Sequence, residues 1–316
     1  MTHLYPMKLA AVAKTAIWGG ERLRRDWQKP SDLPVVAETW ELTVREKENN
    51  IIQNGAFCGK ILADVLKNRG KSWIGTDHSG DRFPLLIKFI DANDRLSVQV
   101  HPDDEFAAKA EGDLGKTEMW YVVDADEGAG ILWGLVPGAT AEDFSKASAA
   151  GDPEPVLRRV EVKKGDCFFI PAGMPHAIGK GILIAEIQQN CDLTYRVYDY
   201  NRRDKDGNLR PLHVAKALEV SCLQKSPALP VIGDGDDALL AECEYFAVRR
   251  LRFDGEGRIT AGKESFVSLL VTEGEGSLCY DGGRLRFSKG DSVFIPAQDR
   301  IFSVEGKCEM ILSRVN

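Results

Sequence analysis

A nearly identical segment occurs twice in this chain, and it constrains the fold more than any other feature. The two copies read KGDCFFIPA at residues 164–172 and KGDSVFIPA at residues 289–297. A Gly-containing turn between two expected strands precedes each copy, at residues 126–132 and 273–278. Because short β modules that recur with Gly turns are typical of repeated all-β units, we predict two small antiparallel barrels or sandwiches in tandem.

The two copies differ in one residue that matters for chemistry. The offset that superimposes residue 164 on residue 289 also superimposes His176 on Ile301, and residues 243–316 contain no histidine. We therefore expect any histidine-based site to lie in the first unit only. The second unit then serves as a support or a lid.

Local patterns add a few short helices and a linker to the β-rich sequence. Apolar residues at helical spacing predict a helix within residues 61–75 that stops at Asn68–Gly70. Other helices are expected at residues 102–110, where Pro and acidic residues open the first turn, from Thr140 to about residue 150, and at residues 212–223. The Pro- and Gly-rich stretch near residues 224–237 predicts a linker. We therefore expect a first domain at residues 1–225 and a second at residues 238–316, joined by residues 226–237.

Composition excludes several classes of protein. The 316-residue chain has a net charge of −7, which argues against nucleic acid or an anionic membrane as the main partner. It contains no apolar run of the roughly 18–20 residues that a membrane span needs, and the N-terminal stretch predicts a first strand rather than a signal peptide. Seven scattered cysteines with no CxxC pair predict a reduced cytoplasmic protein whose thiols are small core residues.

The candidate site begins with a polar stripe on a strand, within Leu96–Asp104. Side chains two residues apart on a strand share one face, so Ser97, Gln99 and His101 project together while aliphatic residues face the other way. We interpret Gln99 and His101 as metal ligands, with Glu118 and His176 on neighbouring strands completing the set. This combination of imidazole, carboxylate and amide suits a borderline divalent ion such as Zn²⁺.

Each of these four residues alone has an ordinary structural interpretation. A single histidine is usually a satisfied core or surface group, and Glu118 alone resembles any strand carboxylate. Two histidines with a glutamate and a glutamine on adjacent strands of one small unit favour a metal site. The remaining histidines, His3, His78 and His213, lie in segments that favour a ligand role less.

Cations accompany the expected ligands. Lys88 and Arg196 lie within apolar or aromatic strands, where an unpaired charge is costly, and Lys116 lies two residues before Glu118. Lys88 is either an edge residue of its strand or a site cation. The partner of these cations is either a carboxylate, Glu186 or Asp192, or a substrate anion. Arginine and lysine together favour a phosphate.

These residues carry a resemblance to a known family. The run Gly165, Pro171, Gly173 and His176 resembles the second motif of the cupin superfamily, with Lys180 in place of that motif's later Asn. LSVQVHPDD (96–104), GKTEMWYV (115–122), IPAGMPHAIG (170–179) and DLTYRVYDYNR (192–202) resemble type I mannose-6-phosphate isomerase in its short bacterial form. The resemblance spans about residues 8–223. It implies a mainly β fold of two cupin (jelly-roll) barrels in tandem with a few short helices, the second barrel being degenerate.

The resemblance also implies the reaction, the cofactor and the residues. It implies an isomerase that interconverts mannose 6-phosphate and fructose 6-phosphate through an enediol(ate), with one Zn²⁺ per chain held by Gln99, His101, Glu118 and His176. It implies catalytic roles for Arg196, Lys116, Glu186 and Asp192, and substrate-binding roles for Lys88, Ser97 and Arg196. The expected partner is a small sugar phosphate, and the expected assembly is a monomer or weak homo-oligomer in the cytoplasm.

Alternatives to this function remain at the level of the sequence. One is a sugar-phosphate-binding cupin without catalysis, and another is a metal-dependent isomerase of a different sugar phosphate. A third is an iron oxygenase, against which Gln99 and the cation cluster argue. The sequence does not choose between Glu186 and Asp192 as the general base, nor does it exclude that both only neutralise Arg196 and the lysines.

Overall fold

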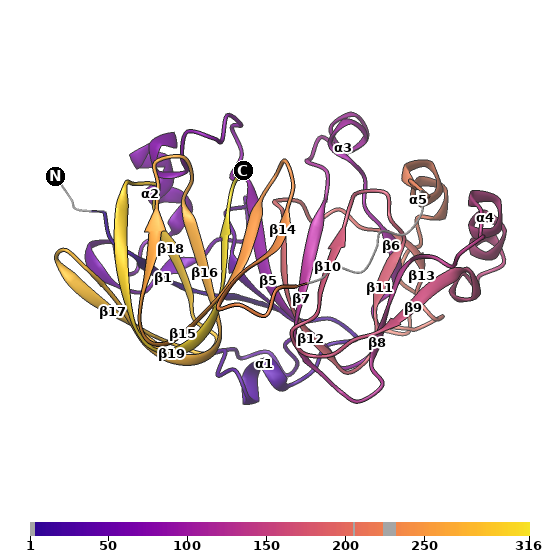
Figure 1. The fold of residues 1–316 in the computed structure, drawn as a ribbon. Coiled ribbons are helices and arrows are strands. Elements are labelled where there is room, and N and C mark those ends of the chain that lie inside the picture. Colours follow the sequence, from indigo (N-terminus) through magenta and orange to yellow (C-terminus); the bar gives the residue numbers. More distant parts are fainter. Residues whose placement is uncertain (1–3, 205, 224–231) are drawn as a thin grey trace.

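Three antiparallel sheets form the framework of the molecule, as predicted for a mainly β chain (Figure 1). The computed structural model describes residues 4–204, 206–223 and 232–316. A six-stranded sheet has the order β10 (Cys167–Ile170), β7 (Glu118–Ala125), β12 (Ile182–Gln189), β5 (Leu85–Ala92), β3 (Glu38–Leu42), β2 (Val12–Lys14). A five-stranded sheet has the order β13 (Tyr195–Tyr198), β6 (Val98–Val100), β11 (His176–Ile178), β8 (Gly130–Leu135), β9 (Leu157–Glu161). We call these two sheets together the first lobe.

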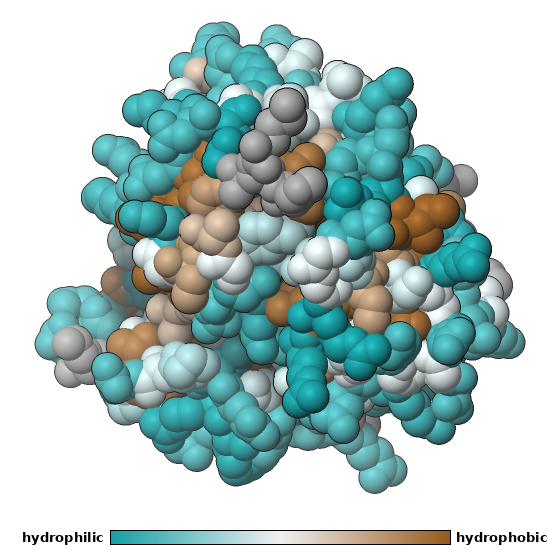
Figure 2. Space-filling view, turned by 90° about the vertical axis from the view of Figure 1, so that its left-hand side faces the viewer, coloured by the Kyte–Doolittle hydropathy of each residue, from teal (hydrophilic) through white to brown (hydrophobic). Residues whose placement is uncertain are grey.

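The third sheet has eight strands, and we call it the second lobe. Its order is β14 (Asp237–Glu242), β15 (Ala247–Ala261), β19 (Arg300–Arg314), β16 (Val267–Tyr280), β18 (Ser292–Ile295), β1 (Met7–Ala10), β4 (Ile51–Ile52), and β17 (Gly283–Ser288) pairs with β16. The outer face of this lobe is largely hydrophilic, with smaller hydrophobic areas between (Figure 2). Its apolar side chains instead pack inside, in a core that includes Val267, Leu269 and Leu312.

The six-stranded sheet lies between the other two and is buried on both faces. Every residue of Leu85–Ala92 and of Ile182–Gln189 is buried. Alternate side chains of β5 divide between two cores: Ile87 and Phe89 pack toward the second lobe, whereas Ile90 packs inside the first. A sheet covered on both faces explains why these strands read as almost continuous apolar runs.

The sequence repeat is a structural repeat. The two copies form β10 and β18, and each strand follows a turn with a glycine at positive φ, Gly165 at 91° and Gly290 at 90°. A residue with a Cβ is strained at such φ values, so glycine is required at both turns. Each strand also pairs with the first residues of a long neighbour, β7 in the first lobe and β16 in the second.

The N-terminal strand belongs to the sheet of the second lobe. Met7 pairs with Phe294, and β4 adds to the other side of β1. The second lobe therefore contains residues from both ends of the described chain. The division into domains at 1–225 and 238–316 stays a prediction, and residues 224–231 of the expected linker lie outside the described residues.

Helices occur where the sequence predicts them, with shorter bounds. The helix expected within 61–75 is α2 (Leu62–Arg69) followed by the 3-10 turn η2 (Lys71–Trp73), and Gly70 separates them at φ 81°. The helix expected from Pro102 is α3 (Asp104–Ala110), because Asp103 is its N-cap and accepts from the backbone N–H of Phe106. The others are α1 (Arg22–Arg25), α4 (Ala141–Ala149), α5 (Val214–Val220), η1 (Gly55–Phe57) and η3 (Glu154–Val156).

A capping box opens α4 at Thr140. The Thr140 side chain accepts from the backbone N–H of Asp143, whose carboxylate accepts from the backbone N–H of Thr140. Among the described helices, each is too short or too polar to span a bilayer.

Candidate metal centre

Three buried side chains bring metal-binding atoms together inside the first lobe. They are His101, which follows β6, Glu118, which begins β7, and His176, which begins β11. One ligand atom from each lies within 4.8 Å of the others. The three residues come from both sheets of the lobe, so the folding of that lobe assembles the group.

Backbone carbonyls orient both imidazole rings. Nδ1 of His101 donates to the Leu193 carbonyl at 2.8 Å, and Nδ1 of His176 donates to the Met174 carbonyl at 2.8 Å. Each Nε2 is thereby left as the free ring nitrogen, 3.6 Å and 3.4 Å respectively from oxygens of Glu118. An imidazole held through one nitrogen with the other facing a shared point is the usual arrangement of a histidine metal ligand.

The protonation states of the two histidines suit metal binding, whereas burial and the neighbouring Glu186 raise the pKa of Glu118 to about 7. Burial lowers the pKa of His176 to about 4 and lowers the pKa of His101 well below its ordinary value, with Lys116 adding to the shift of His101. Both rings are therefore neutral at pH 7, which is the form that binds a metal. Oε1 of Glu118 is buried and accepts no hydrogen bond from any described residue. A carboxylate oxygen left in this way fits a cation ligand.

The side chain of Gln99, on β6, lies close to Nε2 of His176 on the neighbouring strand β11. It lies directly opposite His176 in the pairing of β6 with β11. Its amide nitrogen is 3.3 Å from Nε2 of His176, and a half-turn of the amide group places the oxygen there instead. Ser97, the third member of the polar stripe, is buried two residues before Gln99. The structure thus brings together all four residues predicted as metal ligands.

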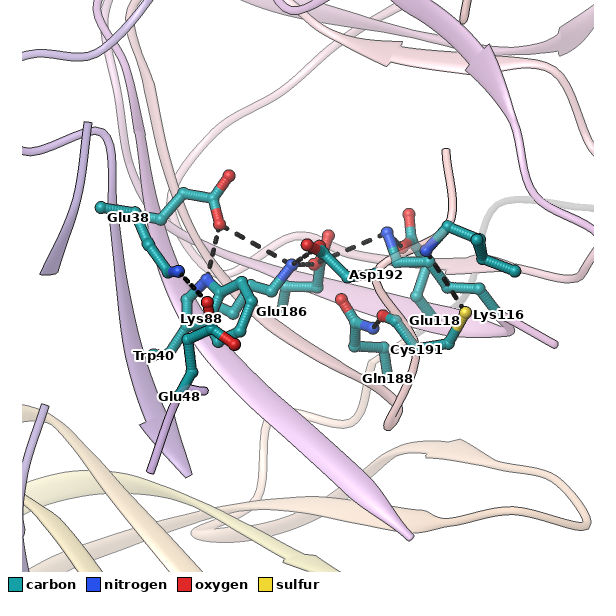
Figure 3. Close-up of polar contacts among 12 residues, drawn as sticks. Glu38, Trp40, Glu48, Lys88, Lys116, Glu118, Glu186, Gln188, Cys191 and Asp192 are labelled. Carbon is teal, nitrogen blue, oxygen red and sulfur yellow. Dashed lines mark hydrogen bonds and ion pairs between the residues drawn. The ribbon is translucent and has the colours of Figure 1, made fainter. Parts of the chain in front are cut away.

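Two buried lysines and two acids surround the metal group. Nζ of Lys116 lies 2.7 Å from Oε2 of Glu118 and 3.1 Å from Nε2 of His101. Nζ of Lys88 lies 3.4 Å from Glu186 and 3.7 Å from Asp192 (Figure 3). Since β5 lies inside its sheet, the interpretation of Lys88 as an edge residue is wrong. Lys88 is a buried cation of the site.

Lys88, Lys116 and Glu186 hold each other in the ionised state. Burial alone would lower the pKa of Lys88, but Glu38, Glu186 and Asp192 outweigh it and the net shift is upward. Burial alone would raise the pKa of Glu186, but Lys116 and Lys88 outweigh it and the pKa is lowered. The site therefore holds lysine ammonium groups and an ionised Glu186 in a desolvated interior.

Arg196 lies on the strand next to Gln99, with which it pairs across β13 and β6. Its Nη1 donates to the Pro211 carbonyl at 2.8 Å, and its Nε is buried with no hydrogen-bond partner among the described residues. The charged groups that act on it are Arg210, Asp199 and Arg202, none of which was predicted as a site residue. Asp192 lies at the exposed side of the cluster, with about half of its side chain accessible. The structure thus gathers Lys116, Glu186 and Asp192 around the metal group, whereas it places Arg196 only through its pairing with Gln99.

Family models match the two ends of the chain separately. The type I phosphomannose isomerase catalytic domain matches residues 7–128, and the cupin domain of mannose-6-phosphate isomerase matches residues 237–315. The chain is 38% identical over 319 residues to the mannose-6-phosphate isomerase ManA of Bacillus subtilis, covering 98% of this chain and 99% of that protein. A mannose-6-phosphate isomerase of Streptococcus mutans is 35% identical over 315 residues, covering 98% of each.

The chain belongs to the type I mannose-6-phosphate isomerase family. A crystal structure of the mannose 6-phosphate isomerase from Bacillus subtilis superimposes with a TM-score of 0.90 at 36% identity, covering 98% of this chain and 99% of that one. A putative mannosephosphate isomerase from Archaeoglobus fulgidus gives a TM-score of 0.79 at 21% identity, covering 100% and 99%, which shows a shared fold. The predicted family and enzyme class are confirmed.

In this mannose-6-phosphate isomerase family member, two tryptophans that the sequence did not single out contact the charged residues of the site. Trp120 donates from Nε1 to Glu186 at 2.9 Å. Trp40 donates from Nε1 to Glu38 at 2.8 Å, and its ring lies 5.1 Å from Nζ of Lys88. The β-rich alternation of residues 37–43 was visible in the sequence, but its position beside Lys88 depends on strand pairing.

Proposed function

We propose that this protein is a zinc-dependent isomerase that interconverts mannose 6-phosphate and fructose 6-phosphate through an enediol(ate). The observation that carries the proposal is the buried group of His101, Glu118 and His176, with Gln99 beside it and with charged side chains that a sugar phosphate needs within the same interior. The family relationship supplies the substrate. The donor set fits zinc because it combines two neutral imidazoles with a carboxylate and an amide.

The four ligands would hold one zinc ion per chain. When bound, zinc would supply a Lewis acid that orients and polarises the sugar oxygens. The four ligands come from three strands, since Gln99 and His101 share β6 and its end. Because backbone carbonyls fix both imidazole rings, little reorganisation would accompany binding.

A carboxylate moves the proton. In the forward direction the C2 proton of the aldose passes to a carboxylate and returns to C1, while a hydroxyl proton moves from O2 to O1. Glu186 is ionised between Lys88 and Lys116, with one oxygen held by Trp120, so it is a base in the form that accepts a proton. Asp192, more exposed and 3.7 Å from Lys88, is the other candidate.

The cations stabilise negative charge on the substrate. Lys88 and Lys116 are buried, where a charge acts more strongly than in water, and they face the carboxylates of the site. Arg196 has an unpartnered Nε with which to hold the enediolate or the phosphate, and Ser97 lines the same face as Gln99. We also propose that the two lobes are cupin barrels and that only the first is catalytic.

The test uses the full chain. Metal analysis should find about one zinc per chain, and a coupled assay should detect fructose 6-phosphate formed from mannose 6-phosphate. Removal of the metal with a chelator should abolish turnover, and added zinc should restore it. Zinc binding without turnover of any sugar phosphate would instead support a binding protein, and bound iron without zinc would overturn the proposed cofactor.

A further inference from the structure

A short turn after β12 carries two contacts of the site. The Leu193 carbonyl accepts from Nδ1 of His101 at 2.8 Å, and the Asp192 carboxylate lies 3.7 Å from Nζ of Lys88. The orientation of a proposed metal ligand and the position of a proposed base therefore both depend on where this turn lies.

Gln188 ties this turn to the sheet from inside the first lobe. Its side chain is fully buried, and its Nε2 donates to the carbonyl oxygens of both Gln189, at 2.8 Å, and Cys191. Figure 3 shows the Gln188 amide against the Cys191 backbone, close to the site residues. Because both neighbours are carbonyls, only the amide nitrogen satisfies them, and the oxygen is left buried with no partner among the described residues.

The two halves of the turn are anchored differently. Asn190 is fixed to the surrounding chain, since its side chain donates to the carbonyls of Val44 and Phe83 and its backbone N–H donates to Pro84. For the next residues, the described hydrogen bonds are those within the turn, the one from Gln188 and the one from His101. Among the described residues, Gln188 thus supplies the hydrogen bond from the sheet to this half of the turn, beside the ion pair of Asp192 with Lys88.

We propose that Gln188 is a positioning residue for the metal centre: by holding the Cys191 carbonyl it fixes the Leu193 carbonyl that orients His101. Gln188 also lies directly opposite the expected ligand Glu118 in the pairing of β12 with β7. Gln188 is therefore linked to two expected ligands, to His101 through the turn and to Glu118 through the strand pairing. This inference rests on the function proposed above, and it concerns a residue outside the expected metal ligands and the expected catalytic and substrate-binding residues.

The test compares Gln188→Met, which keeps the length of the side chain but removes both donors, with Asn54→Leu. Asn54 is a matched control because its amide also holds a loop, accepting from the Lys8 N–H at 2.8 Å and donating to the Pro6 carbonyl at 3.0 Å, in the second lobe's sheet region. Zinc release from the loaded full chain into a chelator should become about 10- to 100-fold faster in Gln188→Met. The absorption spectrum of the Co²⁺-loaded protein should shift, and kcat should fall with KM little changed.

Asn54→Leu should leave zinc release, the Co²⁺ spectrum and kcat unchanged. A second variant, Gln188→Asn, withdraws the amide by one methylene group and should behave like Gln188→Met. Wild-type zinc release and spectrum in both folded Gln188 variants would overturn the inference, and so would failure of both to fold while Asn54→Leu folds. A wild-type protein with no zinc and no isomerase activity would instead overturn the proposed function itself.

Discussion

The two lobes share an arrangement of paired strands, but equivalent positions hold charged residues in the first lobe and apolar residues in the second. In the first lobe Glu118 lies opposite Ile170 of β10, and in the second Val267 lies opposite Ile295 of β18. Because β10 and β18 are the two copies of the sequence repeat, Val267 is the structural counterpart of Glu118. A proposed metal ligand in one lobe is thus an apolar core residue in the other.

The same comparison extends to the next strand. Glu186 pairs with Trp120 in the first lobe, whereas Leu312 pairs with Leu269 in the second. Leu312 and Leu269 fill the core of the second lobe, so the position that holds a charged carboxylate in one lobe holds a hydrocarbon in the other.

The next paired strand carries a basic residue in both lobes, on β5 in the first and on β15 in the second. Lys88 lies opposite Glu186, and Arg249 lies opposite Leu312. Arg249 is partly exposed and pairs with Asp237 at 2.6 Å, whereas Lys88 is buried. The comparison teaches that the strand arrangement does not by itself produce a site. A buried charge needs compensating partners, and Lys88 has three carboxylates within 4 Å in the first lobe, Glu38, Glu186 and Asp192.

The largest effect is expected for Glu118→Gln, which tests whether the first lobe depends on its carboxylate. Loss of a charged ligand should remove bound zinc and lower kcat/KM by more than about 100-fold, while the lobe stays folded. The measurement is metal content with the coupled assay. Glu309→Gln is the matched control, since Glu309 is a buried glutamate of the second lobe that accepts from Tyr121 and Thr272. Full zinc content in Glu118→Gln would contradict the ligand assignment.

Val267→Glu places the first lobe's carboxylate in the apolar core of the second lobe. Of the arginines that line the adjoining cavity, Arg258 and Arg314 are exposed and Arg249 is already paired with Asp237. A buried carboxylate without a buried partner should cost about 3 to 5 kcal/mol of unfolding free energy at pH 7.5, measured with urea. Burial raises the pKa of such a carboxyl in the folded state, so the loss appears above its unfolded value of about 4.3 and diminishes as pH falls toward it.

Val267→Thr controls for the change of shape and polarity. It should cost about 1 to 3 kcal/mol with no dependence on pH, because its hydroxyl does not ionise. A Val267→Glu protein as stable as the wild type at pH 7.5 would show that the second lobe accepts charge as readily as the first, and the comparison would fail.

Tyr121→Phe probes the contact between the lobes. The Tyr121 hydroxyl donates to Glu309 at 2.8 Å across the buried interface. Its loss leaves a buried acceptor with fewer partners and should cost about 1 to 2 kcal/mol, with isomerase activity unchanged. Tyr195→Phe removes a similar bond to Glu111, nearer the surface, and should cost less. Equal losses in urea titrations of the two variants would argue against a special role of the interface.

The smallest difference between the two lobes is expected in the reaction rates of their buried thiols. Burial raises the pKa of Cys191 in the first lobe and of Cys308 in the second to about 11. Both should therefore react slowly with iodoacetamide at pH 8, and both rates should rise about tenfold per pH unit below pH 11 while the protein stays folded. The exposed Cys58 should react first. Peptide mass spectrometry measures the three rates, and a fast Cys191 would show that the site region opens.

Sequence patterns predicted the elements whose signal is local. The alternation within Leu96–Asp104 predicted a strand, observed as β6, and placed the two expected ligands Gln99 and His101 on one face. The helix start predicted at Pro102 is wrong, because the helix begins after its N-cap Asp103. Local propensity does not distinguish a residue just before a cap from one just after it.

The surroundings of the candidate site were beyond local patterns. Trp40 and Glu38 meet Lys88 only because β3 pairs with β5, and Gln188 supports its turn only through the bend after β12. Strand register and side-chain hydrogen bonds between distant segments leave no periodic trace in the sequence. The residues that bear chemistry were therefore easier to find than those that hold them.

The pairing of β1 with β18 affects how the chain can be made and divided. Met7 pairs with Phe294, so synthesis must reach residue 294 before β1 can pair with β18, although β4 is available to β1 much earlier. Contacts this distant in sequence slow folding, because the loop they close is almost the whole chain. A fragment of residues 238–316 made alone would expose the edge of β18 and aggregate more readily than the intact protein. Joining residues 1–60 to the C-terminus of that fragment through a flexible linker would supply the missing strands β1 and β4. The second lobe would then be encoded by one continuous segment of sequence.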